Sequence, residues 1–324
     1  MTFSGSLFLL VFALVQGNED GWGSTKIVAY LAASAVLMLL FVAVERAQRR
    51  PMLDLTLFRL PAFAGASIAA FAISSSMFSM FLYLTLYIQD VLGYEALQAG
   101  LRFLPITLIS FVIAPISGRL SVRIPIRLLL GVGLLLVSGG LLTMTAVEPS
   151  SGWTVLIPGF LLAGAGIGMV NPPLASTAVG VVHDSRSGMA SGINNTFRQV
   201  GIATGIAGLG AVFQHAVVRK TTTALAASAH GREVEHALHG KLAGALVSGG
   251  ARVIGRSLAT PARDALSHAY RVGFTGALSE ILVIASAIAL TGSLFAVALV
   301  RGRDFVSQPA PATADVPLAE TAAG

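Results

Sequence analysis

The sequence predicts an all-α membrane protein with eight transmembrane helices. The 324-residue chain is 55% hydrophobic and only 11% charged, with a mean hydropathy of +0.80, whereas soluble domains carry roughly 25% charged residues. Residues 97–137 read as two apolar runs joined by a short turn that contains Arg119 and Arg123. About 20 apolar residues span a bilayer, and arginine-rich turns face the cytoplasm. This unit is therefore predicted to be a transmembrane hairpin with a cytoplasmic tip.

The other spans follow from the apolar runs on either side of this hairpin. The first run, residues 3–15, is shorter than a span and has no Lys or Arg before it. It predicts a helix whose beginning is missing, not a signal peptide. The acidic segment that follows suits the outside, and the basic cluster after the second run suits the cytoplasm. The eight predicted spans are residues 3–15, 27–44, 62–88, 101–116, 126–147, 154–182, 188–213 and 272–300.

The connections complete the predicted topology, in which both termini lie in the cytoplasm of a multi-pass protein of the cell inner membrane. Residues 52–60 alternate apolar and polar side chains, which predicts a short interfacial helix. Residues 214–271 form the longest connection, and the seven spans before it place it outside. The tail, residues 304–324, is rich in Pro and Ala and is predicted to be disordered.

Composition and motifs exclude several functional classes. Cysteine is absent, so disulfides and thiolate metal sites are impossible. No catalytic triad, metal cluster or nucleotide motif is present, so we expect no enzyme, no cofactor and no bound metal. The net charge of +6 comes from arginines in the connections, which is typical of membrane topology and not of nucleic-acid binding. A set of glycines in the sixth span predicts close helix packing; these are Gly159, Gly164, Gly166 and Gly168.

Several short motifs resemble those of one family. They are PMLDL at 51–55, LFR at 57–59, YIQDVLGY at 87–94, AGL at 99–101, LP at 104–105 and NNTFRQVG at 194–201. Together they resemble the 14-span drug:proton antiporters of the major facilitator superfamily. The resemblance covers nearly the whole chain except the long connection and the tail. It identifies the family well and the substrate poorly.

The resemblance implies both an architecture and an activity. Residues 1–50 are similar to two linker helices between the family's halves, and residues 51–303 to its C-terminal six-helix bundle of two three-helix repeats. The N-terminal bundle is missing, so the chain looks truncated. The implied function is multidrug-type efflux of amphipathic small molecules by alternating access, proton-coupled in the complete protein. Expected partners are the lipid bilayer, these substrates, protons, and a missing N-terminal half or a second copy. The alternative is a non-transporting, half-length membrane scaffold or sensor.

A weak copy of the family's cytoplasmic loop signature follows the fourth span. Gly118, Arg123 and Arg127 resemble parts of the pattern G-x-x-x-D-R-x-G-R, with Val122 in place of the Asp and Pro125 in place of the second Gly. One interpretation is a gate latch between the two halves. The other, which the loss of the acidic partner favours, is charge that sets topology.

The same resemblance directs the search for a substrate site to the first helix of each repeat, which lines the cavity in such folds. In the third span one helical face is spaced i, i+4, i+7 and i+11, flanked by a methionine that can adapt to varied apolar ligands. In the sixth span an Asn precedes a Pro and could release backbone carbonyls into a cavity. Ordinary helix packing is the competing interpretation. The candidate substrate-binding residues are Ser74, Met77, Phe78, Phe81, Thr85 and Asn171.

Two charges within the predicted spans suggest a buried pair. Counted from the ends of their spans, Arg198 and Glu280 lie at similar depth, and Asn194 precedes Arg198 by one turn. Because an intramembrane charge usually has a partner, a pair between Arg198 and Glu280 is expected. Such a pair either joins helices or acts as a conformational or proton switch, and the sequence favours the structural role.

Overall fold

The computed structural model describes residues 2–48, 55–183, 186–238, 246, 259–301 and 304, and within these ranges it contains helices and turns but no strand. The helices, in chain order, are α1 Thr2–Asp20, α2 Thr25–Ala47, the 3-10 helix η1 Leu55–Arg59, α3 Pro61–Leu86, the π-helix η2 Tyr87–Val91, α4 Ala96–Arg102, α5 Leu104–Leu120, α6 Ile126–Thr143, the 3-10 helices η3 Met144–Ala146 and η4 Trp153–Leu156, α7 Ile157–Gly180, α8 Ser187–Ala226, α9 Gly231–Leu238 and α12 Thr260–Leu299.

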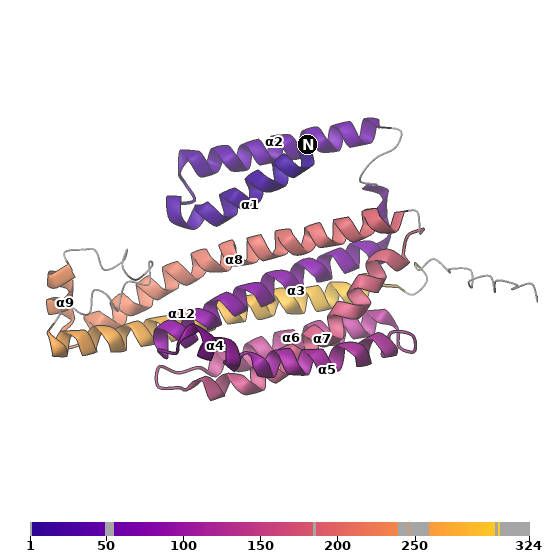
Figure 1. Ribbon diagram of the computed structural model, residues 1–324. Coiled ribbons are helices and arrows are strands. Elements are labelled where there is room, and N and C mark those ends of the chain that lie inside the picture. Colours follow the sequence, from indigo (N-terminus) through magenta and orange to yellow (C-terminus); the bar gives the residue numbers. More distant parts are fainter. Residues whose placement is uncertain are drawn as a thin grey trace, which may run out of the picture.

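The first two helices form a hairpin that lies along one flank of α8 (Figure 1). Two serines join the helices. The Ser6 hydroxyl donates to the Ser34 carbonyl at 2.8 Å, and the Ser34 hydroxyl donates to the Ser6 carbonyl at the same distance. Gly21 adopts a positive φ of 85° in the turn, a backbone conformation that glycine adopts without strain. Reciprocal hydrogen bonds of this kind hold membrane helices together where no hydrophobic driving force exists between them.

Six long helices form the bundle, and its two repeats interlock. Helix α3 packs against α8 and α12, whereas α7 packs against α5 and α6. The first helix of each repeat therefore contacts the second and third helices of the other repeat. Contact between α6 and α12 closes the arrangement, with the Ser138 and Ser286 hydroxyls 2.8 Å apart.

Glycine allows the closest helix crossings, as the sequence predicts. A Cβ placed on Gly164 would lie 2.5 Å from the carbonyl oxygen of Ile106, and one on Gly168 would lie 2.6 Å from that of Ser110. Both crossings join α7 to α5. A Cβ on Gly140 would lie 2.7 Å from the amide nitrogen of Ala163, where α6 meets α7. Backbones this close leave no room for any side chain, which is the usual reason for glycine at membrane-helix interfaces.

Among the described residues, seven helical segments are long and apolar enough to cross a membrane, and the shorter apolar helix Thr2–Gly17 accompanies them. They coincide with the eight expected spans, with one clear difference. Helices α8 and α12 each contain 40 residues and extend well into the region predicted to be a loop at 214–271. A small apolar core joins their ends to α9, made by Leu225, Val234, Ala262, Leu266 and Ala269. A composition-based boundary missed this extension because Arg, Lys and His on its surface resemble a polar loop.

The end of the bundle next to the Arg119 and Arg123 turn is closed by a contact distant in sequence. The Asp304 carboxylate accepts a hydrogen bond of 3.2 Å from the amide of Ala62 in the first turn of α3. An acidic side chain is favourable there because the N-terminus of a helix carries partial positive charge. The interfacial helix expected at 52–60 appears as η1 over Leu55–Arg59, while residues 52–54 and 305–324 lie outside the described residues.

Candidate functional site

Helix α7 is continuous through Pro172 and Pro173. A proline inside a helix leaves the carbonyl four residues earlier without its usual donor. For Pro173 that carbonyl belongs to Met169, and the hydroxyl of Ser117 in α5 donates to it at 2.7 Å. A neighbouring helix thus satisfies the released carbonyl, which is how membrane proteins tolerate proline in a span.

A polar cluster, defined here as Asn171, Asn194 and Arg198, lies next to these prolines. The guanidinium of Arg198 in α8 donates to the Asn171 side-chain oxygen in α7 at 3.3 Å. The Asn171 amide nitrogen donates to the carbonyl of Ile167 at 3.2 Å, which fixes the oxygen toward Arg198. Asn194 is only 6% exposed, and its amide nitrogen has no partner among the described residues. The sequence singled out all three residues but not the contact between Asn171 and Arg198.

The depth of this cluster differs from the sequence-based placement. A Cβ on Gly201 of α8 would lie 2.7 Å from the carbonyl of Phe71, and one on Gly65 of α3 would lie 3.0 Å from Val300. Helices α3 and α8 run in parallel, and Gly201 is level with Phe71. Gly65 lies six residues before Phe71, so it is level with residue 195 of α8, and its contact with Val300 puts both level with the end of α12. Arg198 therefore lies about one turn, or roughly 5 Å, inside that end. It is near one end of the bundle and not at mid-depth.

The pair expected between Arg198 and Glu280 is wrong. Glu280 instead accepts from Arg219 at 2.9 Å and lies 3.0 Å from the Lys220 ammonium. The last nineteen residues of α12, 281–299, are all uncharged, so Glu280 lies at the polar end of the span. Arg219 is 21 positions after Arg198 in α8, or about 30 Å along the helix. The depth assigned from the sequence failed because it started the span at Val272.

Arg198 and Glu280 should therefore contribute independently to stability, because they are far apart and share no partner. We expect Arg198→Met and Glu280→Gln to change stability additively, within about 0.5 kcal/mol, because distant residues without shared partners do not couple. Glu280→Gln alone should cost about 1 kcal/mol or less, since Arg219 and Glu280 are 56% and 35% exposed and exposed ion pairs contribute little. Thermal melting of the purified single and double variants measures both quantities. A double variant more stable than either single variant would restore the pairing that the sequence predicts.

The residues proposed for one substrate-binding face of α3 separate into two environments. Ser74 and Met77 are buried within the bundle, whereas Phe78 is 46% exposed. Phe81 is half-buried, with its ring centroid 5.5 Å from that of Phe103. The Thr85 hydroxyl donates to the carbonyl of Phe81 in its own helix. Phe78, Phe81 and Thr85 therefore remain accessible, while Ser74 and Met77 do not.

The arginines of the degenerate loop signature lie at an exposed turn. Arg123 and Arg127 are exposed at the turn between α5 and α6, and neither forms an ion pair within the described ranges. Arg127 also falls one position after the last arginine of the pattern, where this chain has Ile126. Gly118 lies one turn before that turn, 3.9 Å from Pro172 for a Cβ built on it. This glycine is thus part of the α5–α7 contact next to the polar cluster.

At the other end of the bundle, aromatic rings surround an arginine that was not predicted from the sequence to belong to a site. The guanidinium carbon of Arg102 lies 3.4 Å from the ring centroid of Tyr94 and 5.4 Å from that of Trp153. Such stacking stabilises a charge next to apolar surroundings. A single Arg with a Tyr eight residues before it was a signal in the sequence, but the Trp lies on a distant segment.

The fold and the polar cluster together define a polytopic helical membrane protein with an interlocked pair of three-helix repeats and a flanking hairpin. The model of the Major Facilitator Superfamily matches residues 1–206. The chain belongs to this superfamily, whose members are transporters and not enzymes.

Two curated relatives are similar to this chain in sequence. The chain is 36% identical over 203 residues to "Multidrug resistance protein Stp" of Mycobacterium tuberculosis, covering 63% of this chain and 38% of that protein. It is 34% identical over 208 residues to "Cephamycin export protein CmcT" of Amycolatopsis lactamdurans, covering 63% and 43%. The chain thus spans less than half the length of these relatives.

Solved structures agree on the fold. A bacterial homologue of the human lysosomal transporter Spinster, crystallised inward-facing and occupied, superposes with a TM-score of 0.56 at 16% identity. The match covers 95% of this chain and 70% of that one. At this identity the likeness concerns the fold alone.

Proposed function

We propose that this chain forms one bundle of an exporter of amphipathic small molecules that works by alternating access together with a second six-helix bundle. The observation that carries the proposal is the set of exposed apolar side chains on the first helix of each repeat, α3 and α7. Phe78 and Leu82 of α3, spaced i and i+4, and Leu161 of α7 are all exposed, although α3 and α7 adjoin in the bundle. A second bundle on this side would enclose a cavity lined by aromatic and aliphatic groups, which suits apolar ligands of varied shape.

The relatives support the same substrate class. Proteins named for multidrug resistance, cephamycin export and puromycin resistance share 32–36% identity with this chain over their matched regions. In the proposal, Phe78, Phe81 and Thr85 contact the substrate. The polar cluster serves as the gate between α7 and α8 near one end of the bundle. Proton coupling is assigned to the second bundle, because Glu280 is already held by Arg219 and Lys220.

The proposed domain organisation and orientation follow the sequence. The hairpin within residues 1–50 links the two bundles, residues 51–303 form the C-terminal bundle, and 304–324 form a cytoplasmic tail. Both termini lie in the cytoplasm of the plasma membrane. The turn with Arg119, Arg123 and Arg127 is on that side, as the positive-inside rule requires, and the α9 end is outside.

Cysteine labelling tests this orientation directly, because the chain contains no cysteine of its own. Ser121 lies in the turn between α5 and α6, and Ser150 lies in the turn before η4. A membrane-impermeant maleimide added to intact cells should label Ser150→Cys and not Ser121→Cys. After the cells are opened, both should react. Labelling of both variants in intact cells would contradict the orientation.

Efflux measurements test the function itself. The chain should not export ethidium when it is purified and reconstituted alone, because alternating access requires one bundle to rock against another. Co-expression with the N-terminal six-helix half of the Mycobacterium tuberculosis relative should give ethidium efflux above that of either part alone. Phe78→Ala should reduce this efflux, whereas Leu39→Ala on the hairpin serves as the exposed control.

Two outcomes would contradict the proposal. Efflux by the monomeric chain alone would show that one bundle suffices. A stable complex with the second half that exports none of a panel of amphipathic compounds would favour the alternative, a membrane scaffold or sensor. Pull-down of the co-expressed half distinguishes that second outcome from a failure to assemble.

A further inference from the structure

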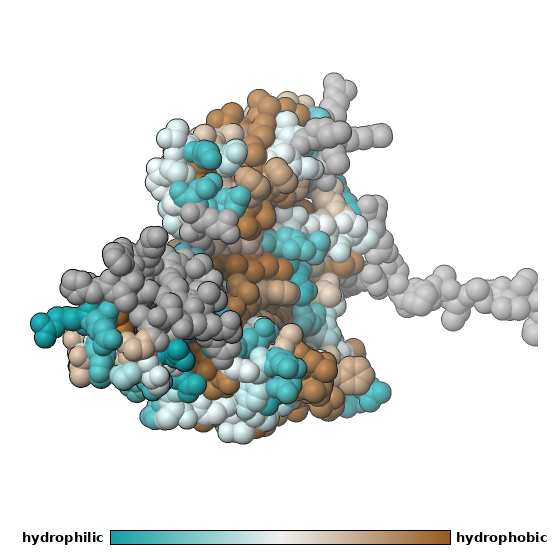
Figure 2. All heavy atoms as spheres, turned by 60° about the vertical axis from the view of Figure 1, so that its left-hand side comes forward, coloured by the Kyte–Doolittle hydropathy of each residue, from teal (hydrophilic) through white to brown (hydrophobic). Residues whose placement is uncertain are grey.

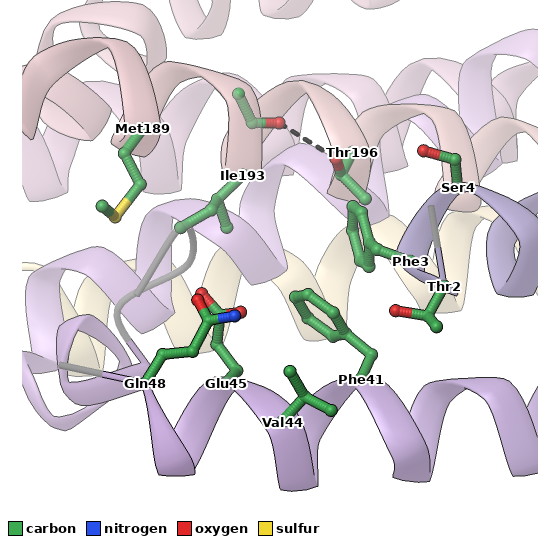
Figure 3. Close-up of a pocket in the computed structure, with 11 residues that line it drawn as sticks. Thr2, Phe3, Ser4, Phe41, Val44, Glu45, Gln48, Met189, Ile193 and Thr196 are labelled. Carbon is green, nitrogen blue, oxygen red and sulfur yellow. Dashed lines mark hydrogen bonds between the residues drawn. The ribbon is translucent and has the colours of Figure 1, made fainter. Parts of the chain in front are cut away.

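Two adjoining cavities lie between the hairpin and the bundle, away from the proposed substrate face. The larger, of about 520 Å³, is bordered by the first turns of α1 and α8 and by the last turns of α2 (Figure 3). The smaller, of about 320 Å³, continues from it between α1, α2, α3 and α8. The two share four lining residues, Phe3, Phe41, Ile193 and Thr196. The two cavities therefore adjoin, and together they are called the cleft below. Ligand sites typically have volumes of roughly 300–1,000 Å³.

The cleft is polar at one end and apolar at the other. Glu45 and Gln48 of α2 point into the mouth, toward Met189 and Ile193 of α8 (Figure 3). Glu45 is only 5% exposed. The inner cavity is lined by aromatic and aliphatic side chains, and its one hydroxyl, on Thr196, already donates to the carbonyl of Gly192. Such a shape suits a ligand with a polar head and an apolar tail.

The position of the cleft indicates which molecule occupies it. Its mouth lies at the end of α2 that carries Glu45, Arg46 and Gln48, where the span meets the membrane surface. Apolar residues cover much of the hairpin and of the neighbouring flank of the bundle (Figure 2), so the inner cavity lies in the lipid phase. An apolar cavity does not hold water, and leaving it empty forfeits the contacts of its lining atoms. In a bilayer, an acyl chain is the apolar molecule at hand.

The polar side chains at the mouth of the cleft favour a headgroup that donates hydrogen bonds. A carboxylate offers about four acceptor positions, and the Gln48 amide adds another, so Glu45 can accept from a ligand in addition to its contacts within the chain. An ammonium group is a three-fold donor that matches these acceptors, and charge-assisted hydrogen bonds of this type are the stronger ones. A headgroup with only a phosphate would place like charges together at the nearly buried carboxylate.

We propose that the cleft binds one amine-bearing phospholipid, with its ammonium group at Glu45 and Gln48 and one acyl chain in the cavity lined by Phe3, Phe41 and Phe197. The lipid fills the space that the hairpin leaves against α3 and α8, and so it fastens the hairpin to the bundle. This site is separate from the proposed substrate face, and the inference does not depend on transport.

Lipid retention on the full chain tests the proposal. Native mass spectrometry of the protein purified from bacterial membranes should show one phosphatidylethanolamine per chain after detergent washing. Val42→Phe, which fills the inner cavity from α2, should reduce this retention at least fivefold. Leu39→Phe, on the same helix at a position 70% exposed, should leave it unchanged. Because Leu39→Phe adds the same ring outside the cleft, a difference between the two variants reports occupancy of the cavity and not the folding of α2.

The headgroup and the source of the ligand need separate arms. Glu45→Gln should lower the preference for phosphatidylethanolamine over phosphatidylglycerol about tenfold, the lower end of what one hydrogen bond to a charged group contributes, in a titration that follows melting temperature. Equal stabilisation of the unaltered chain by the two lipids would overturn the headgroup assignment. Retention unaffected by Val42→Phe would overturn the site. Displacement of the lipid by equimolar dodecyltrimethylammonium would show that the cleft takes soluble amphipathic cations instead.

Discussion

Gly140→Ala should destabilise the protein, whereas Gly139→Ala, one residue earlier in the same helix, should stabilise it. A Cβ on Gly140 would lie 2.7 Å from the amide nitrogen of Ala163 and 2.8 Å from the carbonyl of Gly159. These are backbone atoms of α7 that can move only if the whole helix moves. Overpacking of this kind costs about 1–3 kcal/mol. A Cβ on Gly139 meets nothing within 4 Å, so that substitution should gain about 0.5–1 kcal/mol from helix propensity.

Thermal unfolding of the two variants in detergent, each against the unaltered chain, measures this difference in sign. The pair controls for helix propensity, because both glycines lie inside α6. If Gly140→Ala melted at or above the unaltered temperature, the close contact between α6 and α7 would not exist in solution.

The second large effect concerns the contact between Asn171 and Arg198. Arg198→Met removes the guanidinium that bonds to the Asn171 oxygen, and Asn171→Ala leaves the half-buried guanidinium without that acceptor. We expect each single substitution to reduce efflux by the assembled transporter at least tenfold. The double substitution should cost much less than the sum of the two, because contacting residues couple by about 0.5–3 kcal/mol and a stranded polar group is more costly than a pair removed together.

The measurement is a double-mutant cycle on both efflux and melting temperature. Arg198 with Glu280 provides the matched control pair, because Arg198 in α8 and Glu280 in α12 lie near opposite ends of the bundle and do not touch. Equal coupling in the two pairs would mean that the effect of Arg198 is not carried by Asn171. Accessibility of Ser176→Cys, on the exposed surface of α7, should rise in Arg198→Met if the contact closes the gate between α7 and α8.

The lengths of the apolar runs predicted the fold well, but they did not predict which side chains contact one another. Runs of about 20 apolar residues and the arginine-rich turn were enough to place the helices, because the bilayer restricts the possible structures so strongly. The same reasoning placed the glycines of α7 in close crossings, since only small residues allow backbones to meet. The ends of α8 and α12 were not predictable in this way, because a helix can leave the membrane without changing its conformation.

Partner assignment failed for a related reason. The depth of each residue was counted from the predicted end of its own span, and both of these ends were misplaced. The apparent match in depth between Arg198 and Glu280 came from these two errors. The bond from Ser117 to the Met169 carbonyl was equally hidden, although a proline always leaves such a carbonyl to be satisfied. Which neighbour supplies the donor depends on the packing of α5 against α7, and the sequence of α7 alone does not contain it.

The length of α8 and α12 gives the proposed rocking motion a long lever arm at the α9 end of the molecule. Each helix has 40 residues and is thus about 60 Å long, roughly twice the thickness of the hydrocarbon core. The small core around Leu225, Val234 and Leu266 joins the two ends to α9, which favours their moving together. A tilt of about 10° around the middle of the membrane would move that tip by roughly 5 Å. A small tilt of the bundle within the membrane therefore produces a larger displacement at the α9 end. A fluorescent label attached there can follow this displacement.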